Sequence, residues 1–186
     1  MTERTLFMFR LLLVFSLIFN TLPAFSKVEV VKLKRVNLGL DVPKNWFVKV
    51  GLMGMPLVLI SKSVNNQKAS LSFTPTKHEK VSPSTLRDIK GQFSQYKSGR
   101  EVWMNKRYAK LVKFFDPKVI KNEKNSAAIV GFEYIMDEKK FAEYSINIFC
   151  KDRYIFSKLL YEVRSHPDAY TKAMKTVSSL DCKEWK

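Results

Sequence analysis

The sequence contains only two histidines and two cysteines. Neither histidine, His78 or His166, has a metal-ligand spacing to a cysteine or accompanies a Gly-x-Ser-x-Gly motif, so zinc chemistry and a serine nucleophile are not indicated. We interpret both as solvated loop or helix-start residues. The stretch 51–54 has two glycines but lacks the lysine and the following helix of a phosphate loop. The sequence therefore predicts no cofactor, no metal and no enzymatic activity.

Acidic residues are also scarce. Lys and Arg number 33 against 17 Asp and Glu, which gives a net charge of +16. Such a surplus suits contact with anionic lipid, glycan or nucleic acid, of which nucleic acid is the least expected here. Because the charge is spread along the chain, we favour a generally basic proteome or simple solubility as its explanation.

Long apolar runs are absent outside the N-terminus. Two arginines precede the run 11–19, which is about half of the roughly 20 residues that a membrane span needs. Small residues follow at the −3 and −1 positions of a cut before Lys27. We predict that residues 1–26 are a signal peptide and that residues 27–186 form one soluble domain, periplasmic or secreted. An uncleaved membrane anchor is the alternative.

The two cysteines, Cys150 and Cys182, are too far apart for a Cys-x-x-Cys redox motif. Export would place them where disulfides persist. A helix predicted after the strand at 154–164 runs back along that strand and brings Cys182 toward Cys150. We therefore predict a structural disulfide that contributes about 3 to 4 kcal/mol.

The N-terminal half of the domain is predicted to be mostly extended. Residues 28–42 alternate as a strand that ends at Pro43, because proline cannot donate to a ladder. Trp46 then follows the turn, and we interpret it as a corner of the core that folds over the sheet end. The runs 57–62 and 69–74 flank an Asn-rich loop and predict a hairpin.

The C-terminal half is predicted to hold two helices and a set of long strands. Ser82 as N-cap and Pro83 begin a helix with an apolar stripe that ends near Gly99. Extended runs follow at 107–115, 127–136, 141–150 and 154–164. A second helix begins at Ser165 to Asp168, and its stripe reaches Leu180.

The last two strands allow a test of register. Pairing residues whose numbers sum to 303 sets Ile148 opposite Ile155 and Tyr144 opposite Leu159, so that one face is mostly apolar. A slip by one residue mixes the faces. The fold class is therefore α+β, with a central antiparallel sheet flanked by helices.

The stretch "LGLDVPKNW" resembles the opening of the PsbP-like fold, through Leu40, Asp41, Pro43 and Trp46. The resemblance covers most of residues 36–180 and implies an α/β/α sandwich. Members of that superfamily include accessory subunits of membrane complexes and binding proteins. The resemblance thus implies a non-catalytic role, and it carries over no functional residue by position.

One polar cluster lies on the central hairpin. Glu143 and Glu162 share a face of the paired strands, with Ser145, Asn147 and Lys158 beside them. We take this cluster as the first candidate ligand site, although a cross-strand charge ladder explains it as well. A hydrolase that uses the two acids is the most remote alternative.

Basic residues gather between the first helix and the next turn, interleaved with aromatic residues. This pattern is typical of polyanion binding, although alternation places most of the aromatics toward the core. The candidate residues are Lys106, Arg107, Lys110, Lys113, Lys118, Lys121 and Lys124.

Three functional hypotheses remain. The first is a non-catalytic envelope binding or accessory domain that docks on an envelope protein or a membrane surface, and the second is a basic module that binds anionic lipid or glycan. The third is the hydrolase.

Met53 and Met55 also form a Met-x-Met pair, which suits a flexible apolar loop or ligand flap better than a copper site.

Overall fold

The computed structural model describes residues 27–76 and 82–185. The proposed signal peptide and His78 therefore lie outside the described residues. The elements are β1 (Lys27–Lys32), β2 (Val36–Val42), β3 (Trp46–Leu52), β4 (Met55–Ser61), β5 (Ser70–Pro75), α2 (Leu86–Lys106), β6 (Lys110–Lys121), β7 (Ser126–Met136), β8 (Lys139–Cys150), β9 (Arg153–Glu162), α3 (Ala169–Ser179) and β10 (Asp181–Trp185).

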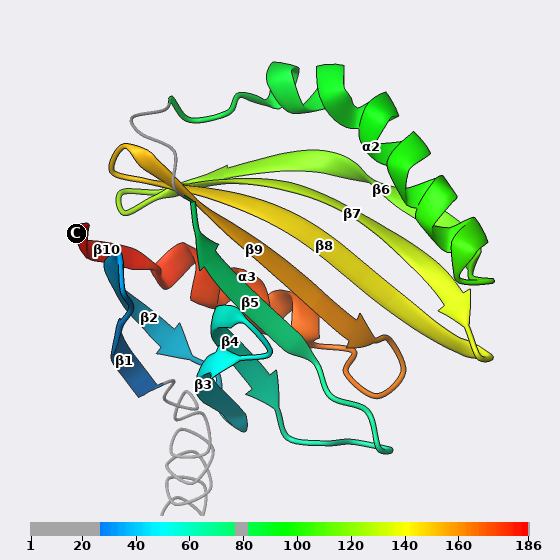
Figure 1. The fold of residues 1–186 in the computed structure, drawn as a ribbon, viewed down its shortest axis with the longest axis horizontal. Helices are drawn as coiled ribbons and strands as arrows, with labels where there is room; N and C mark the ends of the chain where they lie inside the picture. The colour runs from blue at the N-terminus through cyan, green and yellow to red at the C-terminus, as the bar shows by residue number, and fades with distance from the viewer. Residues whose placement is uncertain (1–26, 77–81, 186) are drawn as a thin grey trace, which may run out of the picture.

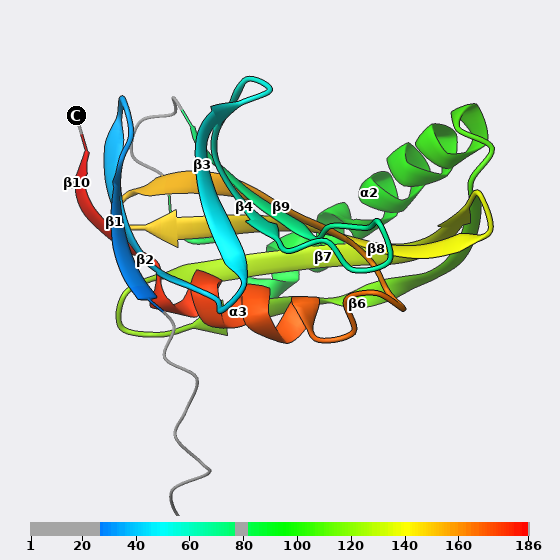
Figure 2. The same cartoon turned by 90° about the horizontal axis from the view of Figure 1, so that it is seen from below.

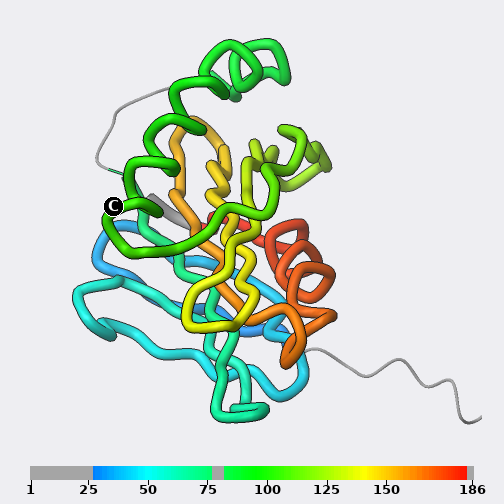
Figure 3. The backbone as a smooth tube through the Cα atoms, turned by 90° about the vertical axis from the view of Figure 1, so that its right-hand side faces the viewer, coloured from blue at the N-terminus to red at the C-terminus, as the bar shows by residue number. Residues whose placement is uncertain are grey.

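The centre of the molecule is a seven-stranded antiparallel sheet in the order β3-β4-β5-β9-β8-β7-β6. Helix α2 lies on one face, over β6 and β7, and α3 lies on the other (Figures 1 and 3). A second sheet of three strands, β1-β2-β10, shares the face with α3 (Figure 2). The predicted α+β architecture is confirmed.

The main core fills the space between the seven-stranded sheet and the layer made by α3 and the small sheet. Alternate residues of each strand point into it, as strand geometry requires. Its members include Leu38, Leu57, Phe73, Ile146 and Val177, each fully buried. A smaller cluster on the opposite face joins Met104 of α2 to Phe132 and Tyr134 of β7.

The register predicted for β8 and β9 is confirmed. Ile148 lies opposite Ile155, and Tyr144 lies opposite Leu159. The hairpin predicted around the Asn-rich loop is β4–β5. Trp46 is buried in the main core, and its amide donates to the carbonyl of Pro43 across the turn, so the interpretation as a corner is also confirmed.

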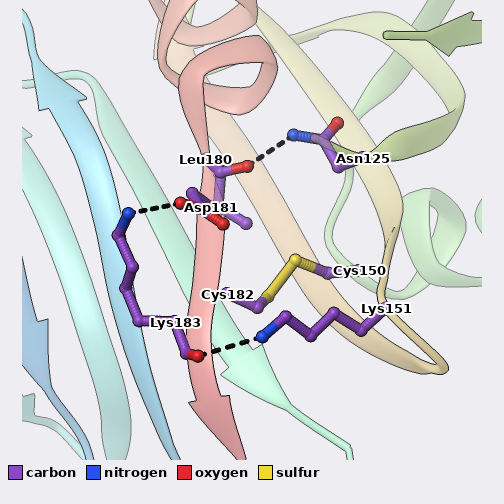
Figure 4. A network of polar contacts seen from close by, with 7 residues as sticks. All are labelled: Asn125, Cys150, Lys151, Leu180, Asp181, Cys182 and Lys183. Carbon is purple, nitrogen blue, oxygen red and sulfur yellow. Dashed lines mark hydrogen bonds and ion pairs between the residues drawn. A yellow bond between two sulfur atoms is a disulfide. The ribbon is translucent and has the colours of Figure 1, made fainter. Parts of the chain in front are cut away.

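The predicted disulfide between Cys150 and Cys182 is present, with a Cα–Cα distance of 6.0 Å. It joins the end of β8 to β10 (Figure 4). Asn125, buried beside it, donates from Nδ2 to the carbonyls of Val177 (2.9 Å) and Leu180 (2.7 Å). Both carbonyls lie at the end of α3, where the last carbonyls of a helix lack the usual intrahelical partners. The carbonyl of Val177 also accepts from the amide of Leu180 (3.3 Å).

Several boundaries differ from the prediction. The run 28–42 is not one strand but the β1–β2 hairpin, which turns at Lys34 and Arg35. Helix α2 begins later, because Thr85 and Asp88 form a reciprocal capping box. It also continues past Gly99 to Lys106, since the residues beyond Gly99 pack on the smaller cluster and outweigh the cost of one glycine.

The strand predicted at 107–115 is β6, which starts later and runs farther, from Lys110 to Lys121. The shift follows from the longer helix and from a turn in which Tyr108 has a φ of 53°. In the described residues, no helix combines the length and the apolar character that crossing a bilayer would need.

Candidate functional site

A groove lies between α2 and the face of the sheet that α2 only partly covers. The C-terminal half of the helix is fixed by aromatic contacts, among them Trp103 against Tyr134 with ring centroids 5.5 Å apart. The one buried residue of the helix, Met104, lies near its C-terminus. Toward the N-terminus the helix is mostly exposed. The space left beneath it has a volume of about 370 Å³ and is lined by Ser84, Asp88, Ile89, Gln92, Phe93, Gln95, Tyr96, Arg100, Ala128, Val130, Ser145, Asn147 and Phe156.

Glu143 of β8 lies on this face of the sheet, and its side chain is 1% exposed. Its Oε1 lies 3.1 Å from Nη1 of Arg100 on α2, and its Oε2 lies 2.7 Å from Nζ of Lys158 on β9. A buried carboxylate is costly unless it is paired, so both contacts stabilise it. The three side chains tie the helix to the two central strands.

Aromatic rings complete the surroundings of Arg100. Its guanidinium carbon lies 5.3 Å from the ring centroid of Tyr96 and 5.7 Å from that of Phe132, within the range of cation–π attraction. Burial raises the pKa of Tyr96 to about 12, and the negative charge of Glu143 adds to this rise, whereas Arg100 and the nearby Ser145 oppose it. Burial, again reinforced by Glu143, raises the pKa of Tyr134 to about 12. Both phenols are therefore neutral donors at ordinary pH.

The structure brings together four of the five residues of the predicted ligand site. Glu143 contacts Lys158, and Ser145 and Asn147 line the groove on the same face. Glu162 shares this face, but its carboxylate is engaged by the turn that follows β9.

The Glu162 carboxylate accepts from the amides of Arg164 (3.0 Å) and Ser165 (2.6 Å). Burial favours its neutral form, but the hydrogen bonds from Ser165 and Arg164 and the Arg164 charge outweigh burial and lower the pKa of Glu162. It lines a separate cavity of about 620 Å³, with Lys139 and Lys140 among the other lining residues. Glu162 therefore has a structural part in shaping the turn.

Sequence reasoning missed Arg100 and Tyr96, the contributions of α2 to the site. A signal was available in the spacing. Tyr96, Arg100 and Trp103 follow one another at intervals of four and three, so the arginine interrupts an apolar stripe. A cation on the packed face of a helix needs an acidic partner on the sheet beneath, which is Glu143.

The basic residues proposed for polyanion binding are all exposed, along the edge strand β6 and at its two ends. Lys113 lies 3.7 Å from Glu133 and 5.1 Å from the ring centroid of Phe115. Two bulges and Pro117 interrupt this strand. Lysines, bulges and proline are also the features that protect a sheet edge from pairing with other chains.

The aromatics among these basic residues mostly face inward, as expected. Trp103 and Phe114 pack against the smaller cluster, and Phe115 stacks on Tyr144 with centroids 5.0 Å apart. Tyr108 is the exception, at 96% exposed.

His166 lies at a helix start, as expected, but it is not solvated. It is buried just before α3, and its Nε2 lies 3.1 Å from the carbonyl oxygen of Gln67. Met53 is highly exposed at the turn between β3 and β4. Over residues 27–76 and 82–185, no group of three or more His, Cys, Asp and Glu could hold a metal ion.

Comparison with known proteins supports the fold. No family model matches the sequence, and no curated protein matches it. The structure is similar to that of LpqN, a Mycobacterium tuberculosis protein involved in cell envelope biogenesis, with a TM-score of 0.51 and 12% identity over 79% of this chain and 83% of LpqN. It is also similar to cyanobacterial PsbP (CyanoP) from Synechocystis, with a TM-score of 0.50 and 13% identity over 87% of this chain and 98% of CyanoP. At these identities the likenesses show the fold alone.

Proposed function

Because the chain has a PsbP-like fold, we propose that it is an exported, non-catalytic binding domain of the cell envelope that docks on a protein or membrane partner. The disulfide between Cys150 and Cys182 supports export, since such bonds persist in oxidising compartments. The involvement of LpqN in envelope biogenesis agrees with an envelope role by analogy of fold.

The groove under α2 is the observation that carries the proposal of binding. It combines apolar walls from Ile89, Phe93 and Val130 with polar groups from Ser145 and Asn147, which is the composition typical of ligand sites. Hydrolysis of a glycan would instead need two acids that face one scissile bond. Glu143 is held in two ion pairs and Glu162 is bonded to its own turn, and this arrangement favours binding over catalysis.

Site-directed photo-crosslinking tests this proposal. A photoreactive residue at Gln92, exposed on the groove wall, should capture a specific envelope component in native cells. The matched control is Ser94, which is also exposed on α2 but does not line the groove. Equal adducts at both positions, no adduct at Gln92, or turnover of an envelope substrate that is lost on substituting Glu143 would contradict the proposal.

The alternative is a basic module that binds anionic lipid or glycan along β6. In the part of the chain that the structure describes, Lys118, Lys121 and Lys124 are exposed and form no ion pair. Replacing all three with glutamine should weaken retention on a heparin-like resin and flatten its dependence on salt. Unchanged retention would leave edge protection as the role of these lysines.

A further inference from the structure

The turn between β3 and β4 places a methionine where turn chemistry disfavours it. Leu52 pairs with Met55, and the two residues between them, Met53 and Gly54, have φ values of 49° and 78°. Positive φ at both central positions identifies a type I′ turn, which strongly favours Asn, Asp or Gly. A methionine in the left-handed region is strained, and strain of this kind points to function.

Two other hairpin turns of the same chain serve as internal references. The β4–β5 loop has Asn65 and Asn66 with φ values of 49° and 59°, and the β7–β8 turn has Asp137 and Glu138 with values of 49° and 60°. Both carry polar residues at the strained positions. Among these three turns, only the β3–β4 turn has an apolar residue at a position of positive φ. That residue, Met53, is 87% exposed to solvent.

The apolar character extends down the hairpin. Val50 is 61% exposed and Phe47 is 55% exposed on β3. We call residues 52–55 the β3–β4 tip. It projects from one side of the molecule, together with the β1–β2 turn (Figure 2).

Three cations lie near the base of this tip. A cavity of about 420 Å³ joins the β1–β2 turn to the base of the tip, and it is lined by Leu33, Lys34, Arg35, Pro56, Thr74 and Pro75. Lys49 is exposed on β3. Within residues 27–76 and 82–185, none of Lys34, Arg35 and Lys49 forms an ion pair, so their charge is available to an external anion.

We propose that the β3–β4 tip inserts into the surface of an anionic lipid bilayer, with Met53 and its apolar neighbours at the acyl boundary and Lys34, Arg35 and Lys49 at the phosphates. Interfacial elements bury their apolar side about 5–10 Å deep and keep long cations at the headgroups. A tip of four residues suits this environment, because it is too small to supply the roughly 800 Å² that a stable protein interface buries on each partner. The inference rests on the proposed function, because it names the membrane as the partner.

This surface is separate from the basic residues of β6. Strands β3 and β6 are the two opposite edges of the seven-stranded sheet. Variants of one edge therefore distinguish it from the other.

Vesicle flotation with the exported protein, purified from the compartment where it accumulates, tests the proposal. The vesicles are equimolar phosphatidylglycerol and phosphatidylcholine, or phosphatidylcholine alone. Met53→Asn installs a residue that the turn favours, so it should fold as stably as the parent, which a urea melt verifies. It should nevertheless lower partition to the anionic vesicles roughly tenfold or more, because a buried methionine is lost.

The charge variant and the control complete the design. Lys34→Gln with Arg35→Gln should weaken binding and reduce its dependence on salt. Arg87→Gln with Lys90→Gln, two exposed cations of α2 that belong to neither basic set, should bind as the parent does. Weaker binding of Lys118→Gln with Lys121→Gln would place the lipid contact on β6 and overturn the inference. A parent that ignores anionic vesicles, or a Met53→Asn variant that binds them equally well, would overturn the inference.

The outcomes separate this inference from the proposed function. Vesicle binding that is insensitive to Met53 removes the tip as the site but leaves a membrane partner in place. Absence of vesicle binding together with a specific protein adduct at Gln92 removes the tip and leaves the proposed function standing. Absence of both removes both.

Discussion

Removing the two cations around Glu143 should destabilise the protein far more than removing Glu143 itself. Arg100 and Lys158 lie 3.1 Å and 2.7 Å from the carboxylate, whose side chain is 1% exposed. The double variant Arg100→Met, Lys158→Met leaves a buried charge without compensation, which costs about 3–5 kcal/mol. Each single variant leaves one partner, so the two single losses should sum to less than the double loss.

Replacing Glu143 should cost less stability than replacing the two cations, because the side chains of Arg100 and Lys158 are partly exposed. The side chains of Arg100 and Lys158 are 26% and 39% exposed, so both charges can turn toward water when the acid is gone. Glu143→Leu should therefore cost no more than about 1 kcal/mol. The triple variant, which replaces all three charges with apolar groups, should be close to the parent in stability or above it.

Urea unfolding followed by far-ultraviolet circular dichroism measures these differences. Lys118→Met, an exposed lysine on β6, is the control and should stay within about 0.5 kcal/mol of the parent. A larger loss for Glu143→Leu than for the double cation variant would refute the reasoning, because it would mean that the cations, not the acid, carry the burial cost.

Three further predictions follow from other parts of the fold. Replacing Cys150 and Cys182 with serine should lower the free energy of unfolding by about 3 to 4 kcal/mol, measured in urea without reductant, since the bond spans 32 residues. Gly131→Ala should cost roughly 1–3 kcal/mol, because its Cβ would lie 2.8 Å from a β8 carbonyl oxygen, and a lower melting temperature would show it. Tyr96 and Tyr134 have pKa values near 12 in the native state and near 10 in the unfolded chain. Between about pH 10 and 12 the folded protein therefore binds more protons than the unfolded chain does. Stability should therefore fall as pH rises through that window, and phenolate absorbance at about pH 11 should increase on unfolding.

The sequence was sufficient wherever a local pattern and a long-range constraint agreed. Alternation fixed the β8–β9 register because a slip would have exposed Ile148 and Ile155. The disulfide followed from the export signal, from the presence of only two cysteines, and from element lengths that bring α3 back along β9. The β1–β2 hairpin was missed because Lys34 and Arg35 are not typical turn residues, so nothing local marks the reversal.

The candidate site could be predicted only in part for a related reason. The strand pairing placed Glu143, Ser145 and Lys158 on one face, because strand neighbours follow from register. Arg100 comes from α2, and its arrival above Glu143 depends on how that helix packs, which no local pattern determines. At the β3–β4 tip a local pattern is informative because it is broken. Met53 occupies a turn position that favours Asn, Asp or Gly, and this departure is what suggests a membrane contact.

The position of β10 in the small sheet bears on the order in which the chain can fold. Strand β2 pairs with β1, next to it in the sequence, and with β10, from the far end of the described chain. Pairings so distant in sequence form slowly, because the intervening chain must first be ordered. The edge of β2 that faces β10 therefore stays unpaired until β10 has docked. The disulfide between Cys150 and Cys182 of β10 then makes this last pairing covalent. Because the chain has only these two cysteines, an oxidant that acts before β10 has docked can form within the chain only this same bond, which would hold β10 near its place.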